Sequence, residues 1–368
     1  MAARNGNPQK DSPTNYEPEE EMEQWQKSLG SSLDSLEDLA KRFGIDPTPL
    51  KPVVERYPMR ISPHYLSLIK EAGDPIWRQC VPDPRELQDT PPIDSYNEAE
   101  LSSVPGLIHR YPDRVVLLVS SSCPMFCRFC MRKSWIKKRR GIDLTESIDQ
   151  AMEYIEKKTA IRDVILSGGD PLLLSDEALE AILIRLRKIP HVEIIRIGSR
   201  APITLPNRVT SKLCRMLRCY HPLYVITHFN HPLEITPQSS KACIQLVDAG
   251  IPVGNQTVLL KGVNDDPPIM KELMQKLLMI RVKPYYIHHM DLVQGTSHFR
   301  TSVEQGKKIM SSLRGHTSGM ATPYYVIDLP EGKGKVPILP DDVRRDGKVL
   351  YLRNYRGEMI EYPDVDEE

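Results

Sequence analysis

Three cysteines in one short loop give the strongest chemical signal in the chain. Cys123, Cys127 and Cys130 form a C-x3-C-x2-C array directly after a predicted strand, and Pro124 disfavours a continuous helix through them. A loop of this kind can wrap three thiolates around an iron-sulfur cube and leave the fourth iron free to bind a small molecule. Two alternatives stay open. The thiols lie together by chance, or they bind structural zinc, although a closed tetrahedral site needs a fourth ligand.

A glycine pair follows the next predicted strand and offers a second binding element. The sequence there is Ser167-Gly168-Gly169-Asp170, followed by proline. Glycines can expose backbone N–H groups to a ligand, and the carboxylate of Asp170 can accept hydrogen bonds from an ammonium group. A plain tight turn is the alternative interpretation.

The elements that must position these two loops are repeated βα units. Beyond Pro105, six β-branched or aliphatic runs alternate with helical periods, which is typical of a parallel sheet. The six runs are 115–120, 163–167, 193–199, 224–228, 252–260 and 283–288. We therefore predict an α/β fold, a partial (β/α)6 barrel, in which the carboxyl ends of the strands meet at one mouth and both loops lie there.

The segments on either side of the barrel differ from it in composition. Residues 1–20 are polar and rich in Asn, Pro, Ser and Glu, so we expect a flexible tail. Short amphipathic segments separated by prolines predict an N-terminal helical cap over 21–105. The barrel is expected over 106–315, and extended segments in 316–368 predict a small β-rich appendage that closes over the mouth.

Composition narrows the class of partner. The chain has 368 residues, with 49 Lys plus Arg against 49 Asp plus Glu, which disfavours a chain-wide basic surface for nucleic acid. No apolar run is long enough to span a bilayer, so we expect a cytoplasmic protein without membrane contact. Its seven cysteines are an odd number, and in a reducing compartment such thiols are more often buried, catalytic or metal-binding than bridged.

Beyond these local patterns, the chain resembles a known family. The cysteine array after the first barrel strand resembles the radical S-adenosylmethionine (SAM) superfamily. Longer strings at 109–114, 228–232, 255–264 and 294–300 resemble lysine 2,3-aminomutases, and the match runs from about Asp74 to nearly the C-terminus. The resemblance implies a [4Fe-4S] cluster on the three cysteines, whose open iron binds SAM and yields a 5′-deoxyadenosyl radical. It also implies pyridoxal 5′-phosphate (PLP) and migration of an amino group from C2 to C3 of an amino acid.

The same resemblance assigns roles to individual residues. It places the contacts to SAM at Ser167, Gly168, Gly169, Asp170, His228 and Gln256. It places the contacts to the PLP phosphate and ring at Arg110, Tyr111 and Arg114. The lysine that anchors PLP would be Lys335 in a glycine-rich loop, and Lys333 is a second candidate. Alternatively, this loop is a flexible hairpin tip at the surface without a function in binding.

Charged positions suggest the substrate. Arg132, two residues beyond the third cysteine, would bind a carboxylate, and Asp291 and Asp328 match the family positions that hold the distal ammonium of lysine. We therefore expect L-lysine as substrate and β-lysine as product. Arginine stays open, whereas the side chain of glutamate would be repelled. Each aspartate could instead serve a helix cap or a turn.

Other functions remain as alternatives. They are a 2,3-aminomutase that acts on arginine or glutamate, a radical SAM enzyme without PLP that modifies RNA or protein, and a relative that makes β-lysine for a translation factor. A non-enzymatic iron-sulfur carrier or zinc-stabilised binding module is a further alternative. For the aminomutase we expect a reduced flavodoxin or ferredoxin-type electron donor, and the resemblance implies a homo-oligomer.

Overall fold

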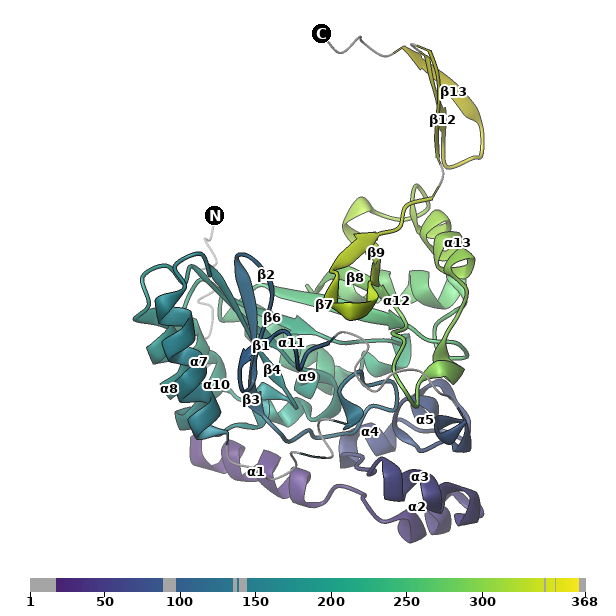
Figure 1. Ribbon diagram of the computed structural model, residues 1–368. Helices are drawn as coiled ribbons and strands as arrows, with labels where there is room; N and C mark the ends of the chain where they lie inside the picture. The colour runs from purple at the N-terminus through teal and green to yellow at the C-terminus, as the bar shows by residue number, and fades with distance from the viewer. Residues whose placement is uncertain are drawn as a thin grey trace, which may run out of the picture.

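A single large sheet organises the protein. The computed structural model describes residues 18–88, 97–134, 138, 144–340, 342–347 and 349–363. In this part of the chain ten strands form one sheet in the order β1 to β10, and three more form a second sheet, β11 to β13 (Figure 1). The predicted α/β class is confirmed.

The six predicted barrel strands are all present. Each lies within one residue of its predicted bounds, and all pair in parallel with their neighbours in chain order. They are β3 (Arg114–Ser120), β4 (Asp163–Gly168), β5 (Ile194–Gly198), β6 (Leu223–Thr227), β7 (Val253–Leu259) and β8 (Lys283–His289). The connecting helices are α7 (Thr145–Lys157), α8 (Asp176–Arg187), α9 (Ala201–Thr204), α10 (Ser211–Arg218), α11 (Pro237–Asp248), α12 (Pro267–Met279) and α13 (Val303–Leu313).

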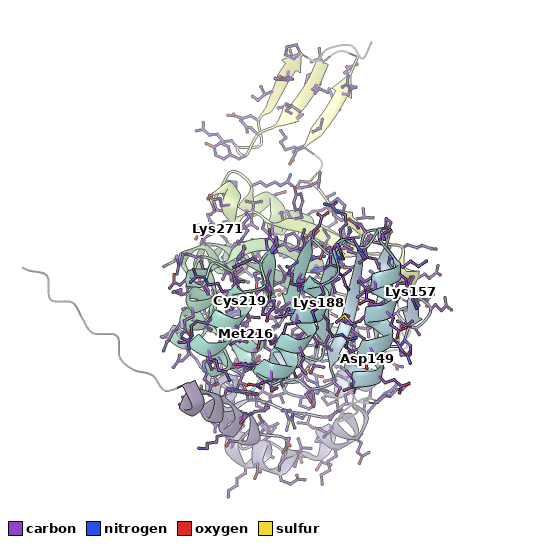
Figure 2. All side chains as sticks on the ribbon, turned by 90° about the vertical axis from the view of Figure 1, so that its left-hand side faces the viewer. Asp149, Lys157, Lys188, Met216, Cys219 and Lys271 are labelled. Carbon is purple, nitrogen blue, oxygen red and sulfur yellow. The ribbon has the colours of Figure 1, made fainter. Side chains whose placement is uncertain are left out.

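Local chemistry explains where these helices begin and which face they bury. Ser175 caps α8 by accepting a hydrogen bond from the backbone N–H of Ala178 at 3.1 Å, which satisfies a donor that the first turn leaves free. Apolar side chains of α8 at helical spacing are buried against the sheet. Figure 2 shows that charged residues such as Asp149, Lys157 and Lys188 lie on the outer surface. None of the described helices is both long and apolar enough to cross a bilayer.

The N-terminal cap is helical and lies against one end of the barrel (Figure 1). Its helices are α1 (Pro18–Gly30), α2 (Leu36–Phe43), α3 (Lys51–Arg56), α4 (Pro63–Ser67) and α5 (Pro75–Cys80), with the 3-10 turns η1 (Thr48–Leu50) and η2 (Pro84–Leu87). Residues 1–17 of the predicted tail lie outside the described residues, whereas 18–20 already belong to α1. The boundary at 105 was also too late, because β1 (Ser102–Val104) pairs with β2 (Leu107–Tyr111) in the main sheet.

The predicted C-terminal appendage requires a larger correction. Strand β9 (Tyr324–Asp328) pairs in parallel with β8, and β10 (Lys335–Pro337) pairs antiparallel with β9. Because α13 returns the chain to the sheet as the earlier helices do, β9 is a seventh parallel strand of the barrel. The separate part consists of β11 (Val343–Asp346), β12 (Val349–Arg353) and β13 (Met359–Pro363). This sheet projects from the body in Figures 1 and 2, so it does not close over the mouth.

Candidate active site

The three predicted cluster cysteines lie in the loop after β3. All three are partly buried, and N–H groups point at two of their sulfurs, from Arg200 Nη1 to Cys127 Sγ at 2.9 Å and from the backbone of Arg132 to Cys130 Sγ at 3.3 Å. Burial, with the nearby Cys127, raises the pKa of the Cys130 thiol to about 11. No group of three His, Cys, Asp or Glu side chains in the described chain is arranged to hold one metal ion.

Buried ion pairs attach this loop to the N-terminal cap. Arg128, inside the cysteine array, donates to both carboxylate oxygens of Glu86 at 2.9 and 2.6 Å. Lys133 Nζ donates to Glu86 at 2.7 Å and to the carbonyl of Gly295 at 2.9 Å. The side chains of Arg128 and Glu86 are 2% and 0% exposed, so the loop is fixed in place without a ligand.

The glycine pair lies against the cysteine loop, and it uses its N–H groups there. The backbone N–H of Gly169 donates to the carbonyl of Ser120 at 2.6 Å, and that of Asp170 donates to the carbonyl of Ser122 at 2.7 Å. A Cβ atom on Gly169 would lie 2.3 Å from the Ser122 carbonyl oxygen, so only glycine permits this approach. The N–H group of Gly169 is therefore used within the fold, and the contact of this element to SAM stays a prediction.

Asp170 also does not offer a free carboxylate to SAM. It is buried, and its oxygens accept from Ser199 Oγ at 2.7 Å and from the backbone N–H groups of Leu172, Arg200 and Ala201 at 2.9 to 3.0 Å. Burial raises its pKa, and these hydrogen bonds act in the opposite direction. These contacts give Asp170 a structural role, which positions the start of α9, and its contact to SAM stays a prediction.

The predicted SAM residues His228 and Gln256 lie directly after strand β6 and on strand β7, respectively. His228 directly follows β6, and its Nε2 is buried with no hydrogen-bond partner among the described residues. Burial lowers the pKa of His228 well below its usual value, so the imidazole is neutral. Its ring lies 5.4 Å from that of Phe129, which belongs to the cysteine loop. Gln256 lies half-buried on β7. A buried nitrogen with no partner suits a bound ligand beside the cysteines.

A second cluster of predicted residues surrounds Asp328 at the end of β9. Its carboxylate contacts Lys335 Nζ at 2.5 Å, His288 Nδ1 at 3.0 Å and Arg110 Nη1 at 3.4 Å. Burial alone would raise the pKa of Asp328, but the hydrogen bond from His288 and the charge of Lys335 lower it to about 2. Asp328 is therefore an ionised carboxylate that already holds a primary ammonium group.

The same contacts bring the two ends of the ten-stranded sheet together. Tyr111 closes β2, and its hydroxyl accepts from the backbone N–H of Lys335 on β10 at 3.0 Å. The guanidinium of Arg114 lies 3.9 Å from the centre of the Tyr111 ring. Lys333 instead pairs with Glu331 at 2.6 Å and is largely exposed, so Lys335 rather than Lys333 lies among the predicted PLP residues.

Arg132 has a partner that the sequence did not suggest. Its guanidinium donates to both carboxylate oxygens of Glu98, at 2.8 and 2.5 Å, and to Ser167 Oγ at 3.4 Å. Burial acts to lower the pKa of Arg132, but the charges of Glu98 and of the more distant Asp291 raise it. The charge of Asp291 thus raises the pKa of Arg132, whereas Asp328 accepts a hydrogen bond from Lys335. The two aspartates, at the ends of neighbouring strands β8 and β9, have different neighbours.

Comparison with known proteins identifies the family. Residues 117–274 match the radical SAM superfamily, and residues 310–368 match the lysine-2,3-aminomutase family. The chain is 48% identical to the L-lysine 2,3-aminomutase of Fusobacterium nucleatum, over 94% of this chain and 83% of that protein. The chain belongs to the lysine 2,3-aminomutase family. The L-lysine 2,3-aminomutase of Clostridium subterminale is 46% identical (92% and 84% covered), and the glutamate 2,3-aminomutase of Clostridioides difficile is 41% identical (94% and 84% covered).

Membership of this family implies a [4Fe-4S] cluster, SAM and PLP, and the residues present suit all three. The cysteine loop offers three thiols together with N–H donors directed at sulfur. Next to it lies the buried, neutral His228. At the other end, a lysine amine, two arginines and a tyrosine meet, which suits an aldehyde that carries a phosphate dianion.

Sequence reasoning missed three residues of this lysine 2,3-aminomutase site. They are Glu86, Glu98 and Arg200, each of which contacts a residue of the cysteine loop or its flank. Arg128 within the cysteine array was a signal for an acidic partner, because a guanidinium enclosed in a buried loop needs a counter-charge. For Glu98 and Arg200 the local sequence carried no such signal.

Proposed function

We propose that this protein is an L-lysine 2,3-aminomutase, which moves the amino group of L-lysine from C2 to C3 and forms β-lysine. One observation carries the choice of substrate. The carboxylate of Asp328, 7% exposed, holds the ammonium of Lys335 at 2.5 Å, which is the chemical group at the distal end of lysine. When Lys335 binds PLP, its charge no longer satisfies Asp328, and the carboxylate is available to a substrate ammonium.

The chain's own residues position and enclose the substrate. Arg132, next to Cys130, is placed to bind the substrate carboxylate after Glu98 is displaced. Asp328, with Asp291 at the neighbouring strand end, supplies negative charge for the distal ammonium. Arg110, Tyr111 and Arg114 hold PLP, and Lys335 anchors it. When bound, the cluster and SAM supply a hydrogen-abstracting radical, and PLP makes the amino group able to migrate.

Glutamate is the main competing substrate, because a glutamate 2,3-aminomutase is 41% identical to this chain. That value is close to the 46–48% of two relatives named for lysine, so overall identity separates the two poorly. The charge of Asp328 distinguishes lysine from glutamate better than overall identity does. A glutamate side chain would bring a carboxylate to the ionised Asp328, and two carboxylates in a partly buried site repel each other. Arginine, with a cationic side chain, competes on charge but is longer.

The test is anaerobic reconstitution with iron, sulfide, PLP, SAM and reductant, followed by parallel assays of L-lysine, L-arginine and L-glutamate. We expect β-lysine as the main product. Asp328→Asn is the diagnostic variant, because it keeps the shape of the side chain and removes its charge, and we expect a selective loss with lysine. Formation of β-glutamate alone would overturn the proposal. Undiminished turnover by Lys335→Ala would support a radical SAM enzyme without PLP.

We further propose that the enzyme acts in the cytoplasm, takes its electron from a reduced flavodoxin or ferredoxin-type protein, and forms homo-oligomers. The C-terminal sheet supports the last point, because Val343, Ile360 and Tyr362 are 65%, 50% and 55% exposed, and apolar groups at such exposure favour association. Light scattering of the full-length protein over a range of concentrations tests it. A monomer at all concentrations would contradict it.

A further inference from the structure

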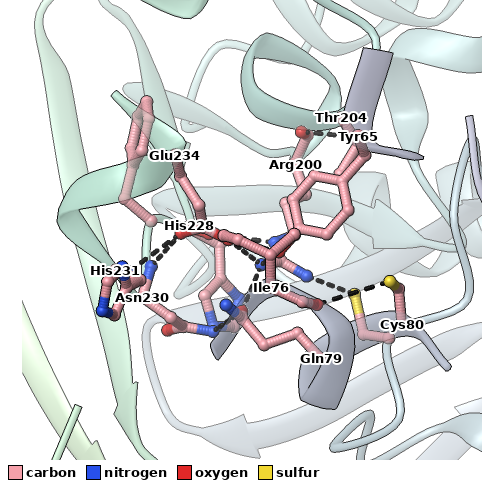
Figure 3. A network of polar contacts seen from close by, with 12 residues as sticks. Tyr65, Ile76, Gln79, Cys80, Arg200, Thr204, His228, Asn230, His231 and Glu234 are labelled. Atoms are coloured by element: carbon pink, nitrogen blue, oxygen red, sulfur yellow. Dashed lines mark hydrogen bonds and ion pairs between the residues drawn. The ribbon is translucent and has the colours of Figure 1, made fainter. Parts of the chain in front are cut away.

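An arginine that the reaction scheme leaves unused lies behind the cysteine loop. Arg200 follows β5, is 8% exposed, and forms the centre of a buried polar network (Figure 3). Its guanidinium donates to Cys127 Sγ at 2.9 Å, Gln79 Oε1 at 2.6 Å, Glu234 Oε1 at 2.6 Å, Tyr65 Oη at 3.3 Å and the His228 carbonyl at 3.1 Å. Its charge is thus aimed at a cluster ligand and excluded from water.

The surroundings hold this guanidinium in one place. Asp170, in the glycine element after β4, accepts from the backbone N–H of Arg200 at 2.9 Å and fixes its main chain. Glu234 neutralises the side chain and is itself held by the Tyr65 hydroxyl at 2.6 Å and by two backbone N–H groups at 2.5 and 3.0 Å. Among the described residues, the side-chain donor to Cys127 Sγ is Arg200 Nη1. Glu234 accepts from the other terminal nitrogen of the guanidinium, Nη2.

We propose that Arg200 raises the reduction potential of the iron-sulfur cluster and so makes the electron needed for SAM cleavage easier to accept. In the loaded protein Cys127 Sγ is an iron-bound thiolate rather than a thiol. One-electron reduction adds one negative charge to the cluster and its thiolates. A fixed positive charge and an N–H donor at one of these sulfurs stabilise that added charge. This role rests on the proposed function only in requiring the bound cluster. Arg200 is a positioning residue here, because it acts through Cys127.

Four variants separate this electrostatic role from a merely structural one. Arg200→Gln removes the charge and should lower the midpoint potential by about 59 mV or more, which corresponds to a tenfold change in the one-electron equilibrium. Arg200→Lys keeps the charge and should restore at least half of that loss. Glu234→Gln leaves Arg200 without its neutralising partner and should shift the potential upwards. Tyr65→Phe removes one hydroxyl of the same network without changing any charge, and the potential should stay unchanged.

The measurement is an anaerobic dithionite titration of the reconstituted proteins, with mediators, in which the signal of the reduced cluster is followed by electron paramagnetic resonance. Iron and sulfide contents are matched first. Opposite shifts in Arg200→Gln and Glu234→Gln support the proposal. Equal potentials in the wild type and both variants would overturn it. If Arg200→Gln does not retain the cluster, Glu234→Gln decides alone, since an unchanged or lowered potential there contradicts the proposal.

This titration needs no amino acid substrate, so its result is independent of the aminomutase assignment. A failed substrate panel with shifted potentials would remove the proposed function and leave the role of Arg200. Unshifted potentials with normal β-lysine formation would do the reverse. The two outcomes are therefore distinguishable on the same preparations.

Discussion

The cysteine loop and the Lys335 loop lie at the same mouth, yet they are built differently. Around the cysteines, the side chains of Arg128, Glu86 and Lys133 are at most 5% exposed. Both cations form hydrogen-bonded ion pairs with Glu86. Lys335 lies on a three-residue strand whose residues are all exposed, and its side chain is 32% exposed. The cluster end is therefore organised by the protein core, whereas the PLP end depends on a few contacts and on its ligand.

This difference predicts that substitutions at the two ends fail in different ways. Changes at Lys335 should remove chemistry and leave the fold, because its strand is exposed and its side chain is 32% exposed. Changes to the buried Glu86 ion pairs, which join the cysteine loop to the cap, should instead lower the stability of the fold.

The largest effect is expected from Lys335→Ala. Without the amine that anchors PLP, turnover should fall by ~10³-fold or more. The free energy of unfolding should change little, because Arg110 and His288 stay in contact with the Asp328 carboxylate. Lys333→Ala is the matched control from the same loop, because Lys333 pairs only with Glu331 at the surface and should leave turnover intact. Product formation and thermal unfolding are measured on both. Loss of activity in Lys333→Ala alone would reverse the assignment.

Glu86→Gln should show the opposite behaviour. It leaves Arg128 and Lys133 buried without a counter-charge, which destabilises the fold by about 3–5 kcal/mol. Glu193→Gln is the control, since it breaks the exposed ion pair with Arg162 and should leave stability nearly unchanged. Urea unfolding of the two variants gives both values. Equal stabilities would show that the cysteine loop is not held by this network.

Arg132→Met should reduce binding of the substrate rather than stability. Loss of a charged, bidentate partner for the carboxylate is expected to lower kcat/KM for lysine by about 10²-fold, mainly through KM. Steady-state kinetics measure this directly. A variant with an unchanged KM would show that the substrate carboxylate binds elsewhere.

The free energy of unfolding should depend on pH through His298, whose pKa is affected by the buried charges of Glu86 and Lys133. Burial lowers its pKa to about 4, against about 6.5 in the unfolded chain. Between these values the unfolded state binds more protons, so stability falls as pH decreases from 6.5 to 4. His298→Gln should remove on the order of 1 to 2 kcal/mol of this loss, allowing for partial exposure. Urea unfolding at pH 7 and pH 5 tests the change, and identical pH slopes would contradict it.

The smallest expected effect is a gain. Glu98 occupies Arg132 in the absence of substrate, so Glu98→Gln should free the guanidinium and lower the KM for lysine about two- to fivefold. Glu100→Gln, two residues away in the same loop, is the control. A higher KM in Glu98→Gln would mean that Glu98 orients Arg132 instead of competing with the carboxylate.

Features that depend on local periodicity, such as the barrel strands, could be predicted from the sequence. The barrel strands were found because β-branched and aliphatic runs alternate with helical periods over short stretches of sequence. Features that depend on distant pairs were not found. Glu86 and Arg128 are 42 residues apart, Glu98 and Arg132 are 34 apart, and no local pattern relates them. Strand β9 was misplaced for a related reason, because only its pairing with β8 shows that it belongs to the barrel.

The structural role of Asp170 was missed for the same reason. Its position after a glycine pair suggested a ligand contact, but its partners, Ser199, Arg200 and Ala201, belong to the end of the next strand. A carboxylate is available to a ligand only when the fold leaves it free, and this cannot be judged from the spacing of the motif.

Amide hydrogen exchange tests the contrast between the two ends most directly. The cluster-loaded protein is compared without PLP, with PLP, and with PLP plus lysine. We predict that ligand slows exchange in residues 107–114 and 328–337 and leaves residues 123–134 unchanged, because that loop is already held by buried ion pairs. Equal protection of both regions before PLP is added, or an equal response of both to it, would contradict a preformed cluster site beside a ligand-ordered PLP site.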